Sequence, residues 1–203
     1  MGSVHRAGTA GRRFEALTVA HHRWYWGVVI RVDSARELLS SIADDVDDDD
    51  VRVQDPRTGH ITLFYAPLRG RRDAPALAER IREAAAAIKP FSVTCSGFDE
   101  FPSTTRPVAW LGVQQGNEEL QSVRTSLCSC DQDCHRHAFV PHLTLAYGEE
   151  AATYAAVHEK IRTHAGSAVC ATHVDAVWIA GFPQNGHPAR DLRYVERVPF
   201  AGQ

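Results

Sequence analysis

The hexapeptide HITLFY occupies residues 60–65, and the similar hexapeptide HLTLAY occupies residues 142–147. Each copy is an apolar, β-prone run in which a histidine and a threonine stand two residues apart. Side chains on a strand alternate between its two faces, so the histidine and the threonine point one way and the aliphatic residues point the other way. Each copy therefore predicts a strand that presents an imidazole and a hydroxyl group on one face and packs aliphatic side chains behind it.

The chain around these two strands has the pattern of a mixed fold with two similar halves. The predicted order of elements is β α β α β β α β α β β, which favours an α+β or α/β arrangement with the helices outside. A strand that carries the motif follows a helix and precedes another in each half, so the two strands are expected to meet at a central cleft. Hydrophobic periodicity and turn residues place strands at about 24–32, 59–66, 91–95, 108–113, 139–147, 174–180 and 192–198, and helices at about 34–42, 75–89, 117–127 and 151–164.

Length and composition describe a single globular domain. The chain has 203 residues, of which 44% are hydrophobic, and its formal net charge is −3. Residues 1–20 are rich in Gly, Ala and Arg without apolar periodicity and are expected to form a flexible leader, with one bilobal domain over residues 21–203. No apolar stretch is long enough to span a bilayer, and no secretory signal is recognisable. The charge argues against a groove for long nucleic acid, so we expect a cytoplasmic protein without membrane contact, and a monomer by default.

The paired residues His60 and Thr62, and His142 and Thr144, suit a reaction that needs a general base and a general acid together. Histidine titrates close to neutral pH, so one ring can be neutral while the other is protonated. Threonine hydroxyl groups beside them can donate hydrogen bonds to anionic oxygens. Opening a cyclic phosphodiester needs this set of groups and needs no metal if the site stabilises the developing charge. A single buried His-x-Thr pair is usually a core pair, but two in the same strand context favour a site.

Two longer segments carry a resemblance to a known family. The segment FVPHLTLA at residues 139–146 resembles the second motif of the two-histidine (2H) phosphoesterase superfamily, in particular the bacterial RNA 2′,3′-cyclic phosphodiesterases once called 2′-5′ RNA ligases. The segment RPVAWLGV at residues 106–113 is similar to the strand that precedes that motif. The resemblance implies an α+β fold made of two pseudo-symmetric lobes of antiparallel sheet with outer helices and a central cleft. It also implies metal-independent hydrolysis of 2′,3′-cyclic phosphates to 2′-phosphates.

Carried over to this chain, the resemblance implies His60 as the general acid and His142 as the general base. Thr62 and Thr144 would bind the phosphoryl group. The near symmetry of the motifs leaves the acid and base roles exchangeable in another substrate pose.

Two tyrosines mark a departure from that family. The RNA-processing members often have an arginine where Tyr147 stands, and Tyr65 occupies the corresponding place in the first half. Tyrosine can donate a hydrogen bond or stack on a base, but it supplies no positive charge. We therefore expect a nucleotide or short oligonucleotide as substrate, bound by Tyr65, Tyr147 and Phe101.

The segment CSCDQDCHRH predicts a possible metal site. Three thiols and two imidazoles within ten residues, those of Cys128, Cys130, Cys134, His135 and His137, could bind a structural zinc ion tetrahedrally. Exposed thiols and a redox-labile disulfide between close cysteines are the alternatives. The zinc would be a structural clip and is not required for catalysis. Six further histidines have no such spacing and are predicted to be ordinary surface or core residues: His21, His22, His158, His164, His173 and His187.

Three functions are compatible with these features. The first is hydrolysis of 2′,3′-cyclic phosphates at RNA ends or on nucleotides by two-histidine acid/base catalysis. The second is degradation of 2′-5′-linked or cyclic oligonucleotide signals on the same fold. The third is a non-catalytic nucleotide-binding protein that uses the Cys/His loop as a metal-dependent contact, although two intact His-x-Thr motifs argue against it.

Overall fold

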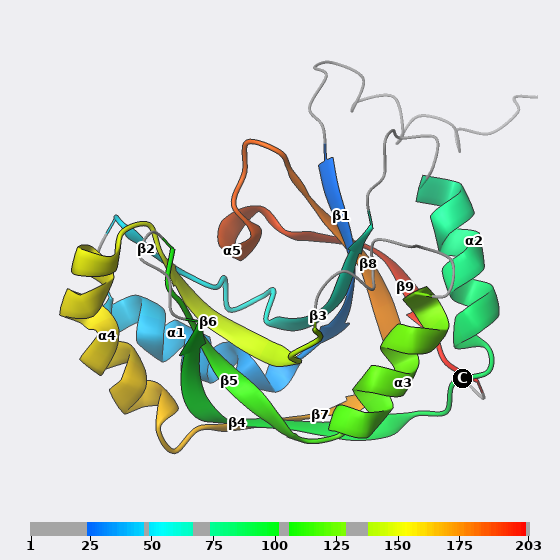
Figure 1. Cartoon of the computed structure of the whole chain (residues 1–203), viewed down its shortest axis with the longest axis horizontal. Helices are drawn as coiled ribbons and strands as arrows, with labels where there is room; N and C mark the ends of the chain where they lie inside the picture. The colour runs from blue at the N-terminus through cyan, green and yellow to red at the C-terminus, as the bar shows by residue number, and fades with distance from the viewer. Residues whose placement is uncertain (1–23, 47–48, 67–73, 102–105, 129–137, 202–203) are drawn as a thin grey trace, which may run out of the picture.

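A computed structural model describes residues 24–46, 49–66, 74–101, 106–128 and 138–201, and these residues form one antiparallel sheet with helices packed on it (Figure 1). The sheet has nine strands in the order β7-β4-β5-β6-β3-β1-β8-β9, and β2 pairs with β6 off this path. The strands are β1 (Trp24–Arg31), β2 (Val51–Val53), β3 (His60–Ala66), β4 (Phe91–Phe101), β5 (Val108–Gln115), β6 (His142–Gly148), β7 (Val169–Val174), β8 (Ala176–Pro183) and β9 (Arg193–Pro199). The helices are α1 (Arg36–Asp45), α2 (Ala74–Ala85), α3 (Asn117–Cys128), α4 (Ala151–Ala165) and α5 (Pro188–Asp191), and a 3-10 turn η2 (Asp33–Ala35) precedes α1.

The predicted fold class is confirmed: the sheet consists of two lobes that meet where β3 pairs with β6. In one lobe α1 and α4 lie together and α4 packs on β4 and β6, and in the other α2 lies against α3 and packs on β8 and β9. The sheet is strongly curled. The hydroxyl group of Thr172 in β7 lies 3.5 Å from the carbonyl oxygen of Arg31 in β1, although four strands separate the two in the sheet order. The two lobes therefore share one continuous half-barrel.

The aliphatic residues of both hexapeptides form the centre of the core. Ile61, Leu63, Leu143 and Leu145 are at most 2% exposed and belong to the large apolar cluster that the helices cover. Their burial removes apolar surface from water, which is the main force that stabilises the sheet. The His and Thr side chains point to the opposite face, on which Val29, the strand partner of Thr62, belongs to a second, smaller apolar cluster with Leu192 after α5.

The structure adds three elements to the seven strands and four helices that the sequence predicted. These are the short strand β2, the edge strand β7 and the single turn α5. The sequence of β7, VCATHV, offers only two buried side chains and an exposed valine, so its apolar alternation is weak. β2 has only three residues, and its pairing with β6 rather than its own sequence defines it.

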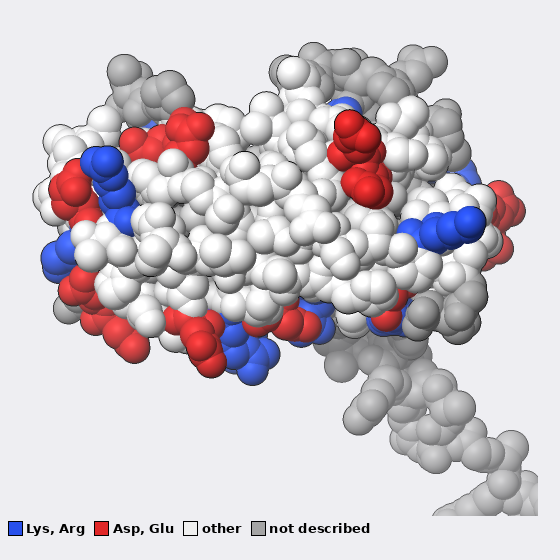
Figure 2. Space-filling model, turned by 90° about the horizontal axis from the view of Figure 1, so that it is seen from below, with Lys and Arg blue, Asp and Glu red and all other residues white. Residues whose placement is uncertain are grey.

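Two further observations bear on partners. No helix in the described part of the chain is long and apolar enough to cross a membrane. On the face seen from below in Figure 2, basic and acidic side chains mix around the edge, and the described basic residues form no continuous track across it. The leader at residues 1–20 lies outside the described residues, so its predicted flexibility stays a prediction.

Candidate active site

The two hexapeptides lie side by side in the middle of the sheet, as the first residues of β3 and β6. These strands run antiparallel with Ile61 paired to Leu143. In this antiparallel register His60 lies opposite Thr144, and Thr62 lies opposite His142. Since cross-strand partners share a face of the sheet, the two imidazoles and two hydroxyl groups are related by a local two-fold axis and lie on one face.

Each histidine ring is oriented by a carbonyl group two residues before it. Nδ1 of His60 donates to the carbonyl oxygen of Thr58 over 2.7 Å, and Nδ1 of His142 donates to that of Val140 over the same distance. A carbonyl oxygen can only accept, so Nδ1 carries a proton in both rings and the neutral tautomer leaves the lone pair on Nε2. The two halves therefore offer two equivalent Nε2 atoms for proton transfer.

The support behind His60 comes from the loop before β3. Gln54, which is almost fully buried, donates through Nε2 to the carbonyl oxygen and to the hydroxyl group of Thr58, over 3.2 and 2.8 Å. The backbone N–H of Asp55 donates to the carbonyl oxygen of Ala189 in α5. These bonds hold the carbonyl group that orients the His60 ring.

A β-bulge in each hexapeptide brings the tyrosines to the same face. Leu63 has no partner on β1, because the register passes from Val28–Phe64 directly to Val29–Thr62. Leu145 has no partner on β5 in the equivalent place. Without the extra residue a side chain three positions after the threonine would face the core.

The bulges place each tyrosine hydroxyl beside its own threonine. The hydroxyl group of Tyr65 interacts with that of Thr62, and the hydroxyl group of Tyr147 interacts with that of Thr144. Desolvation of the phenolate is the main cause that raises the pKa of both tyrosines, although the Tyr65 side chain is 48% exposed, so both stay protonated donors at neutral pH. The structure thus extends each His-x-Thr pair to a set of three groups: imidazole, threonine hydroxyl and tyrosine hydroxyl.

Burial lowers the pKa of both histidines. The His60 side chain is only 5% exposed, and desolvation of its cation, assisted by repulsion from His142, lowers its pKa to about 4 in spite of the bond to Thr58. The pKa of His142 is lowered for the same main reason. The sequence suggested one neutral and one protonated ring, but in the free protein the neutral form is favoured in both.

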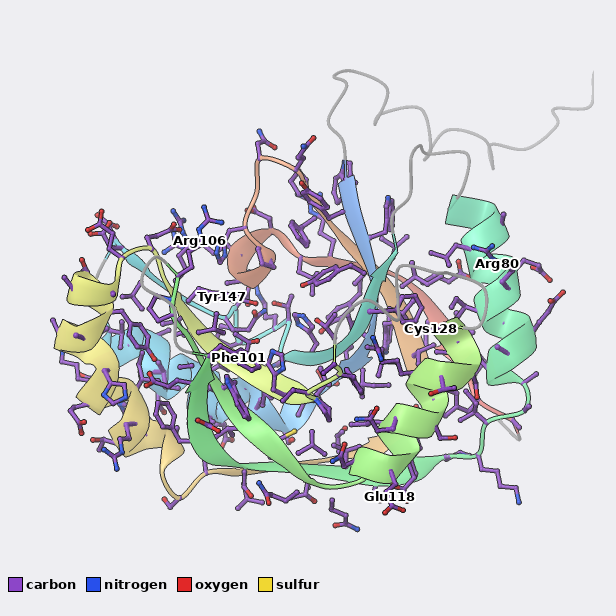
Figure 3. All side chains as sticks on the ribbon, in the orientation of Figure 1. Arg80, Phe101, Arg106, Glu118, Cys128 and Tyr147 are labelled. Atoms are coloured by element: carbon purple, nitrogen blue, oxygen red, sulfur yellow. The ribbon has the colours of Figure 1, made fainter. Side chains whose placement is uncertain are left out.

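Aromatic rings surround His142, and one of them was not singled out from the sequence. The ring of Phe101 meets the His142 ring edge to face at 4.9 Å and stacks on Trp110 at 5.0 Å. Trp110 is the strand partner of Thr144, so it lies on the same face, 5.7 Å from the His142 ring. A groove of about 390 Å³ extends from Trp110 past Gly112 to Val140 and Pro141, next to His142. In Figure 3 Phe101 and Tyr147 lie near the middle of the molecule, with Tyr147 next to α5.

His187, which the sequence left without a role, lies against the predicted site. Its ring contacts Tyr147 edge to face at 4.8 Å. It precedes α5, and its Nδ1 accepts a hydrogen bond from the backbone N–H of Ala189. The loop that carries it lies about forty residues beyond the second hexapeptide, so no local spacing could indicate the contact.

The predicted zinc site falls mostly outside the described residues. Cys130, Cys134, His135 and His137 are not described, and Cys128 is the buried last residue of α3 and is disulfide-bonded. A disulfide was one of the alternatives that the sequence left open. Among the residues that the structure describes, no group of three or more His, Cys, Asp or Glu side chains could hold a metal ion. The zinc site stays a prediction.

Comparisons with known proteins agree with the fold. The sequence model of the 2'-5' RNA ligase superfamily matches residues 31–181, which include both hexapeptides. The structure of TT0787 of Thermus thermophilus is similar with a TM-score of 0.66 and 15% identity, over 88% of this chain and 99% of that one. E. coli LigT in apo form is similar with a TM-score of 0.62 and 17% identity, over 89% and 99% of the two chains. LigT complexed with 3'-AMP matches with a TM-score of 0.61 and 16% identity, over 86% and 97%. No curated protein matches the chain in sequence.

Proposed function

This chain belongs to the 2'-5' RNA ligase superfamily, and on that premise we propose that it is a metal-independent phosphodiesterase that opens 2′,3′-cyclic phosphates at RNA ends or on nucleotides. One observation carries the proposal. His60 and His142 are held in the same tautomer by equivalent carbonyl groups, 2.7 Å from Nδ1, with a threonine of the other strand opposite each. Two matched proton-transfer groups around two hydroxyl donors suit in-line displacement at a phosphorus atom.

The reaction requires that one proton is removed from the attacking water and that one proton is donated to the leaving ribose oxygen. Nε2 of neutral His142 accepts a proton from water while the water oxygen bonds to phosphorus. The bond between phosphorus and the ribose O3′ breaks, and Nε2–H of protonated His60 donates its proton to O3′. The product is a nucleoside 2′-phosphate. Thr62 and Thr144 donate to the non-bridging oxygens, on which negative charge grows in the transition state.

Tyr65, Tyr147 and Phe101 have supporting roles in this proposal. The tyrosine hydroxyl groups orient the threonines that they contact, and they add neutral donors to the site. Phe101 fixes the plane of the His142 ring through the edge-to-face contact. A nucleoside would lie along the groove next to His142.

The test of this proposal is hydrolysis of nucleoside 2′,3′-cyclic monophosphates in the presence of EDTA. We expect turnover unchanged by the chelator, because the proposed mechanism uses only side chains, and a 2′-monophosphate as the product, because O3′ leaves. Chromatographic separation of the 2′ and 3′ isomers measures both. Turnover abolished by EDTA and restored by zinc would contradict the mechanism, and a 3′-monophosphate would exchange the roles of the two histidines.

The pH dependence is a second test. The reaction requires His60 protonated and His142 neutral, and the pKa of both rings is lowered in the free protein. As pH rises through these pKa values both rings become neutral and the acid is lost, so kcat/KM should be highest on the acid side of pH 6.5 and fall toward neutral pH. A bound anionic phosphoryl group favours the imidazolium ion, so the profile of kcat should lie at higher pH than that of kcat/KM. A kcat/KM that keeps rising up to pH 8 would contradict this assignment.

A further inference from the structure

A cluster of charged and polar side chains lies at the end of β6, beyond Tyr147. We call Arg52, Arg106, Glu149 and His187 the rim cluster. The sequence predicted no positive charge in this place, because Tyr147 stands where related RNA-processing proteins often have an arginine. The arrangement of neighbouring strands changes that expectation.

Strand pairing brings Arg52 to Tyr147. Arg52 is in β2, and its Cα partner on β6 is Tyr147 itself, so both side chains leave the sheet on the same face. Nε of Arg52 lies 2.5 Å from Oε1 of Glu149, two residues after Tyr147 on that face. Both side chains are about one-third exposed, at 31% and 32%, so the guanidinium group stays accessible to a ligand.

His187 supplies a neutral donor next to Tyr147. Because its Nδ1 accepts a hydrogen bond from the backbone N–H of Ala189, the proton of the neutral ring is on Nε2. Burial is the main cause that lowers its pKa, with Arg52 acting in the same direction, so the ring is neutral at neutral pH. Edge-to-face contact with Tyr147 fixes the position of the ring.

Glu149 is the one carboxylate of the rim cluster, and three of its members act on it. Arg106 is exposed and interacts electrostatically with the carboxylate of Glu149, as Arg52 and His187 do. Within the rim cluster two guanidinium groups therefore act on one carboxylate, and Arg190 and Asp191 shift the pKa of His187 in opposite directions. Figure 3 shows Arg106, Tyr147 and Phe101 following one another along one side of the space between the lobes. The rim cluster therefore continues the candidate active site outward with guanidinium and imidazole N–H groups, which can donate hydrogen bonds to an anion.

We propose that the rim cluster binds a second phosphate of the substrate, the one attached to the 5′ oxygen of the ribose whose 2′,3′-cyclic phosphate is opened. On a terminal nucleoside the 5′ position is the other place where a phosphate is attached. Guanidinium groups and a neutral imidazole N–H are suitable donors to a phosphate. The proposal rests on the proposed function for the place of the first phosphate, and it favours RNA ends and 5′-phosphorylated nucleotides over nucleoside cyclic monophosphates.

The test measures binding, so that it does not depend on turnover. Calorimetric titration of the full chain with adenosine 2′,5′-bisphosphate and with adenosine 2′-monophosphate gives the ratio of their dissociation constants. We expect the bisphosphate to bind at least about tenfold tighter at low salt, and this advantage to shrink at high ionic strength, because exposed charges are screened. Equal binding of the two ligands would overturn the proposal, even if cyclic phosphates are hydrolysed. Absent hydrolysis with a clear bisphosphate preference would instead count against the proposed reaction alone.

Substitutions that remove a positive or a negative charge can show whether the rim cluster binds phosphate or only stabilises the fold. Arg106→Gln and Arg52→Gln should each reduce the bisphosphate preference by about threefold or more, whereas Glu149→Gln, which raises the net positive charge, should increase it. Arg80→Gln is the matched control, because Arg80 is an exposed arginine of α2, at the opposite edge of the molecule from Arg106 in Figure 3. If all four variants keep the same preference, or if Glu149→Gln lowers it together with thermal stability, the rim cluster only ties β2 to β6 and the proposal is wrong.

Discussion

Replacing His60 or His142 by alanine is expected to lower kcat on a nucleoside 2′,3′-cyclic monophosphate by about 10²- to 10⁴-fold. Each ring presents Nε2 for one of the two proton transfers, and its Nδ1 is committed to a backbone carbonyl group. The double variant should be little worse than either single variant, because residues that act as a unit lose their effect together. Steady-state kinetics of the three variants measures both statements.

The controls for this prediction must separate catalysis from stability. His173→Ala removes an exposed histidine from β7 and should leave kcat unchanged. Thermal unfolding of all variants shows whether the fold survives. His60 is buried, so a moderate loss of stability is expected from its removal, but His142 is partly exposed, and its variant should unfold close to the temperature of the wild type. If His142→Ala lost stability and activity in parallel, the two histidines would be core residues and the proposed mechanism would fail.

The second large effect is expected from the threonines. Thr62→Val and Thr144→Val keep the shape of the side chain and remove the hydroxyl donor, and each should lower kcat/KM by about 10- to 100-fold. The double variant is expected to lose about 10³-fold, because neither threonine hydroxyl group then remains to stabilise the charge on the non-bridging oxygens. The loss should fall mainly on kcat, since the bonds strengthen as charge develops on the non-bridging oxygens.

A matched substitution tests whether the site needs these particular hydroxyl groups. Thr163 is an exposed threonine of α4 whose hydroxyl group donates to the carbonyl oxygen of Glu159, and Thr163→Val should leave kcat/KM within about twofold of the wild type. Binding of inorganic phosphate to the double variant Thr62→Val with Thr144→Val gives an independent readout. Phosphate binding as tight as in the wild type would show that the threonines do not hold the phosphoryl group.

The hydrophobic pattern of the sequence predicted those strands and helices whose own residues have a clear apolar periodicity. The hexapeptides at 60–65 and 142–147 carry their own alternation, so their strands and buried aliphatic residues could be predicted, and helices such as α4 have a clear apolar spacing at Tyr154, Val157 and Ile161. The two strands that were missed, β2 and β7, are defined mainly by their neighbours in the sheet. Their sequences alone contain too little apolar alternation to predict a strand.

The candidate site was predictable in its centre and not at its edges. His60, Thr62, His142 and Thr144 repeat a pattern, and the repeat itself is visible in the sequence. The cross-strand register places Trp110 and Arg52 at the site, and a distant loop brings His187 to it. Neither position can be inferred from spacing along the sequence. The same reason explains why the sequence did not indicate that Arg52 lies opposite Tyr147.

The pairing of Ile61 with Leu143 also has a consequence for how the chain reaches its working state. The two residues are about eighty positions apart, so closing that loop is entropically costly and must be offset by contacts from both lobes. Neither half of the chain contains a complete set of reacting groups, and a partly folded intermediate with only one lobe formed would be inert. Recovery of activity after dilution from denaturant would therefore report the last long-range step of folding, in which β3 and β6 pair and join the two halves.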